Sequence, residues 1–209
     1  RIQLAWREDA RQQPDQQQVG DGRVDVPGTT YSWLQAGNAP RWQLMPPGSV
    51  AEGYTNDELA DTNDQHDYGT DWLASTIRAA AADYRDTYLK THTSAALLVV
   101  NDVSLPQGGY TPDHAGHETG LACDLKLPRT DGRSGGTTYK DSRYNRTSTR
   151  AILYSLRRQP LVDKIYFNDP TLIGEGLCTR LAGHDNHIHF QIKPPVREPW
   201  LAPLVATSN

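Results

Sequence analysis

Two segments with alternating side chains, LACDLKL at residues 121–127 and HIHFQIK at residues 187–193, decide the fold that the sequence predicts. Alternation between apolar and polar residues is typical of a β-strand, whose successive side chains point to opposite faces of a sheet. Two further strands are expected at residues 94–104 (SAALLVVNDVS), where the long apolar run indicates burial, and at residues 163–168 (DKIYFN). The chain therefore supplies four strands to one sheet.

Two segments are expected to be helical. In residues 71–90 the apolar side chains recur at spacings of four and three, on one face of a helix, with Thr70 or Asp71 as the N-cap. Residues 148–159 predict a second helix, which ends at Pro160 and carries arginines in the last turn, where the helix dipole favours them. Helix, two strands, helix and two strands is a mixed order, so we expect an α+β fold with a small, mostly antiparallel sheet flanked by helices.

The N-terminal residues differ in composition from the rest. RQQPDQQQVGDG at residues 11–22 is polar and rich in turn formers, and no clear period follows it. We therefore expect an arm or small irregular subdomain at residues 1–48, in which RIQLAW is a weak strand candidate, and one domain at residues 49–209. A chain that begins at Arg1 is expected to be a processed form or a piece of a longer protein.

Charge and composition argue against two classes of partner. The net charge of −4 gives no basic surface for nucleic acid or for an anionic membrane. No apolar run approaches the roughly 18 residues of a membrane helix. The two cysteines, Cys123 and Cys178, permit one disulfide at most, and two buried thiols are equally compatible with the sequence.

Histidines gather in two short segments. Five of the seven lie in HAGHETGLACD (residues 114–124) and HDNHIH (residues 184–189). The other two, His66 and His92, stand alone and are expected to be surface or capping residues. One isolated histidine usually caps a turn or satisfies a hydrogen bond in the core, but that explanation accounts poorly for five in two clusters.

The spacing within these segments brings potential ligands together. Gly120 provides a turn, so that His117 on a loop and Asp124 on the following strand can fold toward one point. His187 and His189 alternate along a predicted strand and face the same side, about 6–7 Å apart. One of them is then placed to bind a metal ion and the other to reach its bound water.

Imidazole and carboxylate ligands suit zinc. Three protein ligands with one open position are typical of a catalytic zinc site, whereas structural sites are closed and usually contain thiolates. Cys123 directly precedes Asp124, so its side chain points to the opposite face of the strand. Cys178 has no metal-like spacing to other residues, and we exclude both cysteines from the site.

Residues 100–128 (VNDVSLPQGGYTPDHAGHETGLACDLKLP) together with HDNHIHF at residues 184–190 resemble the penicillin-insensitive murein endopeptidases. These are zinc peptidases of the group that includes D-Ala-D-Ala carboxypeptidases and the hedgehog signalling domain. The family pattern is HxxHxTGxxxD after SLP and GG, with a closing HDxHxH. It is met by His114, His117, Thr119, Gly120 and Asp124, and by His184, Asp185, His187 and His189. The resemblance covers roughly residues 49–195, with Asn186 where the family often has Asp and Gln191 where it often has Arg.

The resemblance implies a hedgehog-like or D-Ala-D-Ala-peptidase-like fold whose sheet carries a zinc ion. The implied ligands, with water as the fourth, are His117, Asp124 and His189. His187 is the implied general base or transition-state stabiliser, while His184 and His114 line the site and His114 is also a candidate to bind or orient the metal. The implied activity is hydrolysis of peptide cross-links in peptidoglycan stem peptides by a zinc-activated water, in a periplasmic or secreted protein.

The substrate side is less well defined by the residues. YKDSRYNRTS (residues 139–148) includes Arg143 and Tyr144, and its guanidinium groups suit the carboxylates of stem peptides if the segment forms a groove wall. An ordinary solvated loop is the competing interpretation. Asp185 either holds an imidazole N–H or is an exposed turn residue.

Three other functions remain as alternatives. They are a carboxypeptidase or other peptidase of the same zinc group, a non-catalytic zinc-containing recognition module, and a metal-dependent nuclease. The presence of both His184 and His187 beside the implied ligands favours catalysis over recognition. The acidic net charge and the lack of a basic stripe disfavour the nuclease.

Overall fold

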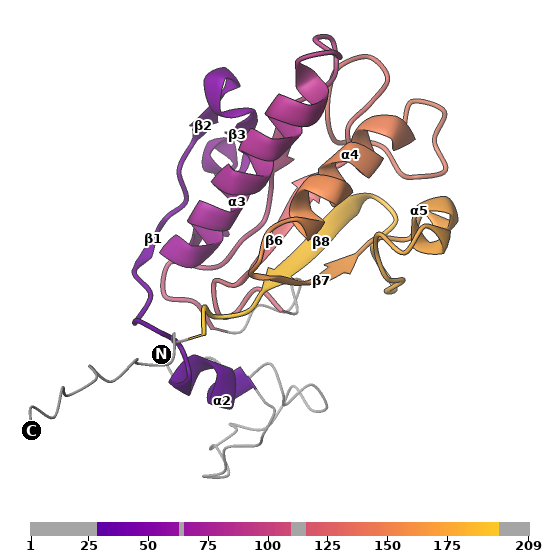
Figure 1. Cartoon of the computed structure of the whole chain (residues 1–209). Coiled ribbons are helices and arrows are strands. Elements are labelled where there is room, and N and C mark those ends of the chain that lie inside the picture. The colour runs from indigo at the N-terminus through magenta and orange to yellow at the C-terminus, as the bar shows by residue number, and fades with distance from the viewer. Residues whose placement is uncertain (1–28, 63–64, 110–115, 197–209) are drawn as a thin grey trace, which may run out of the picture.

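A six-stranded mixed sheet forms the centre of the computed structural model, which describes residues 29–62, 65–109 and 116–196 (Figure 1). In sheet order its strands are β2 (Gly48–Ser49), β3 (Tyr54–Asn56), β5 (Leu98–Val100), β6 (Ala122–Lys126), β8 (His187–Ile192) and β7 (Val162–Tyr166). Only the β3–β5 pair in this sheet is parallel, and the other neighbours are antiparallel. The predicted α+β fold with a mostly antiparallel sheet is therefore confirmed.

Two longer helices accompany the sheet and lie side by side across it in Figure 1. They are α3 (Asp71–Tyr84), which continues as the π-helical turn η3 (Arg85–Leu89), and α4 (Arg146–Arg157). The shorter elements are α2 (Thr29–Leu34), α5 (Pro170–Gly174), the 3-10 turns η1 (Val50–Glu52) and η2 (Glu58–Ala60), and the antiparallel pair β1 (Trp42–Leu44) and β4 (Tyr68–Thr70). Within the described residues, no helix is both long and apolar enough to cross a bilayer.

Helix α3 begins where the sequence predicted. The Thr70 hydroxyl accepts the backbone N–H of Leu73 at 3.2 Å, which satisfies one of the N–H groups that have no partner within the helix. Leu73, Ile77 and Tyr84 lie on the predicted apolar face and are fully buried. The Tyr84 hydroxyl donates to the Ala96 carbonyl at 3.1 Å, so its ring is buried without leaving the polar end unsatisfied.

Helix α4 begins two residues earlier than expected because Asn145 caps it. The Asn145 side-chain oxygen accepts the Ser148 N–H at 3.0 Å. Ile152, Leu153 and Leu156 lie within one turn of each other and are buried against the sheet. The apolar face of α4 therefore closes the part of the core that α3 leaves uncovered.

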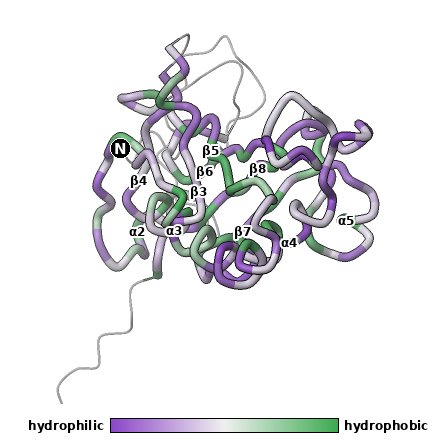
Figure 2. The backbone as a smooth tube through the Cα atoms, turned by 90° about the horizontal axis from the view of Figure 1, so that it is seen from above, coloured by the Kyte–Doolittle hydropathy of each residue, from purple (hydrophilic) through white to green (hydrophobic). Residues whose placement is uncertain are grey.

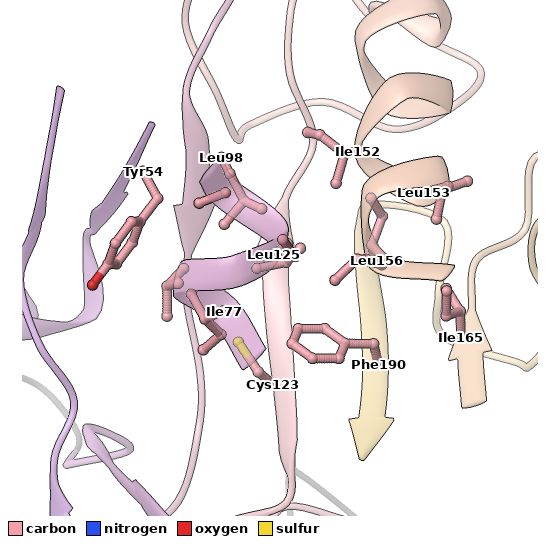
Figure 3. Packing of buried hydrophobic residues seen from close by; sticks show 14 of the residues in the cluster. Tyr54, Ile77, Leu98, Cys123, Leu125, Ile152, Leu153, Leu156, Ile165 and Phe190 are labelled. Carbon is pink, nitrogen blue, oxygen red and sulfur yellow. The ribbon is translucent and has the colours of Figure 1, made fainter. Parts of the chain in front are cut away.

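The core lies between these helices and one face of the sheet. Figure 3 shows Ile77 of α3 and Leu156 of α4 pointing toward Cys123, Leu125 and Phe190 of β6 and β8. Each of the three strand residues is fully buried. Figure 2 shows hydrophobic stretches toward the middle of the molecule and mostly hydrophilic ones along its outer loops. The face of the β6–β8 pair that carries Cys123, Leu125 and Phe190 therefore belongs to the hydrophobic core.

The bounds of one predicted strand and of the predicted N-terminal arm differ from those in the structure. The predicted strand at residues 94–104 is shorter, since only Leu98–Val100 pairs as β5 and the chain then turns toward Asp124. Residues 42–49, within the expected N-terminal arm, pair with other strands through β1 and β2. The strand candidate RIQLAW lies outside the described residues.

Candidate metal centre

The strand register places Asp124 and His189 opposite each other. They are directly paired in the antiparallel β6–β8 ladder, so their side chains leave the same face of the sheet. Their neighbours Cys123 and Phe190, paired in the next register position, point to the opposite face and into the core. Strand parity therefore separates a polar face from an apolar one, as the sequence predicted for Cys123.

A loop brings His117 to this polar face. The loop turns at Gly120 with φ of +70°, and a Cβ there would lie 2.4 Å from the Trp42 ring, so only glycine fits. The Ser104 hydroxyl joins both ends of the turn, because it donates to the His117 carbonyl and accepts the Gly120 N–H. The Trp42 indole N–H is itself held by the Pro106 carbonyl at 2.7 Å.

Three ligand-type atoms form a small triangle at the point where these segments meet. His117 Nε2 lies 3.1 Å from His189 Nδ1 and 3.3 Å from Asp124 Oδ1, and the last two atoms are 2.8 Å apart. The corresponding separations in a tetrahedral zinc site with bonds near 2.0–2.1 Å are about 3.3 Å. The three residues are at most 4% exposed. This buried group, His117, Asp124 and His189, can hold a metal ion.

The hydrogen bonds around His117 select the tautomer that a ligand needs. His117 Nδ1–H donates to the Val103 carbonyl at 2.5 Å, and a carbonyl oxygen can only accept. In the neutral imidazole this leaves the lone pair on Nε2, which faces Asp124 and His189. A backbone carbonyl that fixes the second nitrogen is the usual support of a metal-binding histidine.

Burial and mutual charge shift the pKa values of all three residues. Burial alone would raise the pKa of Asp124, but the adjacent His117 and His189 outweigh it and hold that pKa well below its usual range. Burial would likewise lower the pKa of His117, but the Asp124 carboxylate outweighs it and raises that pKa. Burial dominates at His189 and lowers its pKa. The site therefore contains an ionised carboxylate at neutral pH.

His187 lies at the open edge of this group. Its Nε2 is 3.6 Å from Asp124 Oδ2, and its side chain is 24% exposed, against 5% for the carboxylate. Burial lowers the pKa of His187. Its Nδ1–H donates to the side-chain oxygen of Asn186 at 2.9 Å, which leaves the lone pair on Nε2. The sequence prediction did not include Asn186 as a partner of this imidazole.

His184 and Tyr166 complete the aromatic surroundings. The His184 ring centroid is 4.7 Å from that of His187 and 5.5 Å from that of His189. His184 Nδ1–H donates to the Ala182 carbonyl at 2.9 Å. The Tyr166 ring lies 5.8 Å from that of His189, its partner in the β7–β8 register. Sequence reasoning missed Tyr166, whose only signal was its place in a predicted strand.

Asp185 contacts a lysine, an asparagine and a backbone N–H rather than an imidazole. Its carboxylate accepts Lys140 Nζ and Asn168 Nδ2, both at 2.8 Å, and its carbonyl accepts the Tyr139 N–H. These bonds fasten the loop before β8 to the segment around residue 140. Asp185 thus supports the position of the histidine loop through its contacts with Lys140 and Asn168.

The predicted substrate-binding residues Arg143 and Tyr144 do not form a groove wall beside the metal centre. Arg143 is exposed and bound to Asp141 at 2.7 Å, so it lies on a solvated turn. Tyr144 is buried, with its ring 6.0 Å from that of Phe167, and it belongs to the hydrophobic core rather than to an exposed wall. His114 lies outside the described residues.

Both cysteines are buried and carry free thiols. Burial raises the pKa of Cys178 to about 12 and raises that of Cys123 well above its usual range, so neither is a thiolate at neutral pH. Of the two arrangements that the sequence allowed, the structure has the one without a disulfide. No thiolate ligand is therefore offered to the metal centre.

No protein-family model matches this chain, and no curated protein matches it. The capacity to hold a metal ion is therefore supported by the geometry of His117, Asp124 and His189 and by the hydrogen bonds that orient them.

Proposed function

We propose that this chain is a zinc-dependent peptidase that hydrolyses the peptide cross-links of peptidoglycan stem peptides. The observation that carries the proposal is a buried His117–Asp124–His189 triangle with a fourth imidazole, His187, 3.6 Å from the ligand carboxylate. An isolated structural site would not need a partly exposed imidazole beside it. The sequence resemblance to murein endopeptidases supplies the substrate class.

Zinc is the metal that the donor set supports best. Two imidazole nitrogens and one carboxylate oxygen, without thiolate, match the three-ligand sites of zinc hydrolases. A zinc ion bound there supplies Lewis-acid polarisation of a peptide carbonyl and lowers the pKa of a water molecule. The fixed Nε2 lone pair of His117 and the ionised Asp124 carboxylate are in the protonation states that such binding requires.

His187 is the proposed general base. Its burial-lowered pKa keeps the imidazole neutral at pH 7, with the Nε2 lone pair available because Nδ1–H is donated to Asn186. The side chain is exposed enough to meet a water molecule and a substrate. It can therefore accept a proton during attack and return it to the leaving amine, as general acid–base catalysis requires. The adjacent His184 ring limits the rotamers that His187 can adopt.

The substrate is proposed to approach over the open edge near His187. Lys140 binds Asp185, two residues before His187 in the chain, and its side chain is 64% exposed. An exposed ammonium group close to His187 in the chain suits the free carboxylates of stem peptides. A substrate of this kind lies outside the cytoplasm, so the proposal includes a periplasmic or secreted location.

Digestion of purified peptidoglycan tests the proposal. The zinc-loaded full chain is expected to convert cross-linked muropeptide dimers to monomers, and excess chelator is expected to stop the reaction until zinc is restored. Release of terminal D-alanine with the dimers unchanged would instead indicate a carboxypeptidase. Zinc bound at one equivalent with no change in any muropeptide would contradict hydrolysis and favour a recognition module.

A further inference from the structure

A second group of ligand-type side chains lies outside the metal centre. Glu58, His66 and Asp102 each offer one ligand atom, and these atoms all lie within 4.8 Å of one another. Glu58 is 2% exposed and His66 is 6% exposed. The sequence predicted His66 to be a surface or capping residue, so its burial beside two carboxylates is a finding of the structure.

The parallel pairing of β3 and β5 brings the two carboxylates together. Asn56 is paired with Val100 at the carboxyl ends of these strands, and Glu58 and Asp102 each follow that pair by two residues. The ends of neighbouring parallel strands meet at one edge of a sheet. The Asp57 N–H donates to the Val100 carbonyl at 3.0 Å, which keeps the two chains in step beyond the strands.

A third segment adds the imidazole. The Val103 N–H donates to the His66 carbonyl at 2.7 Å, which places His66 beside the residue that follows Asp102. The Glu58 N–H donates to the Asn56 side-chain oxygen at 3.2 Å, which fixes the start of η2. Three backbone segments are therefore held independently at the point where their side chains converge.

Charge favours a cation at this point. Two carboxylates this close repel each other when both are ionised, and the burial of Glu58 limits the water that would screen them. A divalent cation would neutralise both, and the imidazole would complete a three-residue ligand set. Ligand atoms at 2.0–2.2 Å from a tetrahedral ion lie about 3.3–3.6 Å apart. The three atoms here lie within 4.8 Å of one another, so binding requires the side chains to close by at most about 1.5 Å.

We propose that Glu58, His66 and Asp102 form a second divalent-cation site. Two oxygen donors and one nitrogen donor suit first-row ions such as Zn²⁺ and Mn²⁺, and the set is richer in oxygen than the His117–Asp124–His189 centre. The proposal does not depend on the hydrolysis proposed above. It assigns a site to residues that the metal centre does not use.

Backbone hydrogen bonds connect the proposed Glu58–His66–Asp102 site to the His117–Asp124–His189 centre. The Asp124 N–H donates to the Asp102 carbonyl, and the Asn101 N–H donates to the Asp124 carbonyl, both at 2.9 Å. A cation that fixes Asp102 thus also fixes the backbone of a residue in the metal centre. Its role in this position is structural, since Glu58 and His66 are almost fully buried.

Zinc stoichiometry of the full chain tests the proposal. Protein stripped with chelator is incubated with excess ZnCl₂, passed through a desalting column and measured by elemental analysis. We expect two zinc ions in the parent chain, one in Glu58→Gln and one in Asp124→Asn. Asp57→Asn is the matched control, because Asp57 adjoins Glu58 but pairs at the surface with Lys126, and it is expected to retain two.

The two sites give distinguishable failures. Two zinc ions in a folded Glu58→Gln protein, or none in a folded Asp124→Asn protein, would overturn the second site. If the parent chain binds one ion, loss of that ion in Glu58→Gln supports the second site and removes the first, and loss in Asp124→Asn does the reverse. Circular dichroism confirms folding, and Asp102→Asn and His189→Gln replace any variant that does not fold.

Discussion

At the positions of Asp124 and His189, both faces of the β6–β8 strand pair are buried, but for opposite physical reasons. On one face Cys123, Leu125 and Phe190 are fully buried among apolar side chains of α3 and α4. On the other face Asp124 and His189 are only 4% and 3% exposed. Apolar burial is favourable in itself, whereas a buried charge is costly unless it is paired. The same backbone therefore carries a stabilising face and a face maintained by mutual polar contacts.

The two faces should tolerate substitution differently, because only the polar face holds the proposed metal ligands. Helices cover the apolar face, and side chains there can be exchanged for others of similar size. On the polar face, the turn held by Ser104 and Gly120 places His117, and hydrogen bonds orient the imidazoles of His117 and His187. Changes on the two faces should therefore separate into effects on chemistry and effects on stability.

The largest expected effect lies at the edge of the polar face. His187→Ala is expected to lower peptidoglycan hydrolysis by about 10²–10⁴-fold, because the proposed general base is lost. Zinc content should stay the same, since His187 is not one of the three proposed ligands. Muropeptide separation and elemental analysis measure the two properties on one sample, with Arg150→Ala, which only breaks the ion pair with Glu175, as the control. Equal activity in parent and variant would contradict the assigned role.

The apolar face should respond in the opposite way. Phe190→Ala is expected to reduce the free energy of unfolding by about 3–5 kcal/mol, through lost burial and the cavity that remains. The zinc content of the folded fraction should not change, because Phe190 points away from the ligands. Urea denaturation with chelator gives the stability. A loss of zinc without a loss of stability would contradict the assignment of stability to the apolar face and metal binding to the polar face.

A smaller effect is expected for the side chain that orients His187. Asn186→Ala removes one hydrogen bond to Nδ1, and a net value of about 0.5–1.5 kcal/mol corresponds to about 2- to 10-fold in kcat. KM and zinc content should remain at parent values if Asn186 acts only through His187. Asn186→Asp keeps an acceptor at that position and is expected to restore kcat in part. A fall in zinc content would show that Asn186 supports the ligands instead.

The pH dependence of the metal-free chain should show the smallest difference. The depressed pKa of Asp124 adds stability above the unfolded value near 4, which is lost as pH falls through the folded pKa. The raised pKa of His117 adds stability below about 6.5, which is lost as pH rises through its folded pKa. The parent chain should therefore exceed Asp124→Asn in stability most between about pH 4 and 6.5. Urea titrations in chelator from pH 3 to 9 measure the gap, and a gap that is flat across this range would contradict the pairing.

Local patterns were enough to predict much of the fold. The spacing of Leu73, Ile77 and Tyr84 predicted the buried face of α3, and its cap at Thr70 is confirmed. Strand parity predicted that Cys123 and Asp124 point to opposite faces. These features depend on residues within a few positions of each other, where periodicity alone determines direction.

Long-range pairing could not be predicted in the same way. Glu58, His66 and Asp102 have no common motif, and only the parallel register of β3 and β5 and a backbone bond from Val103 bring them together. Tyr144 stands in a polar segment that predicted an exposed loop, yet packing against Phe167 buries it. Such contacts depend on the path of the chain between elements, which no local pattern specifies.

The contact between Trp42 and Gly120 gives the metal centre an optical reporter. The indole lies against the turn that positions His117, and its N–H is bonded to the loop at Pro106. Indole emission depends on the polarity and rigidity of its surroundings, so tightening of this loop should change the fluorescence of Trp42. Subtracting the spectrum of Trp42→Phe separates its emission from that of the other four tryptophans. Occupancy of the centre could then be followed in real time without a label.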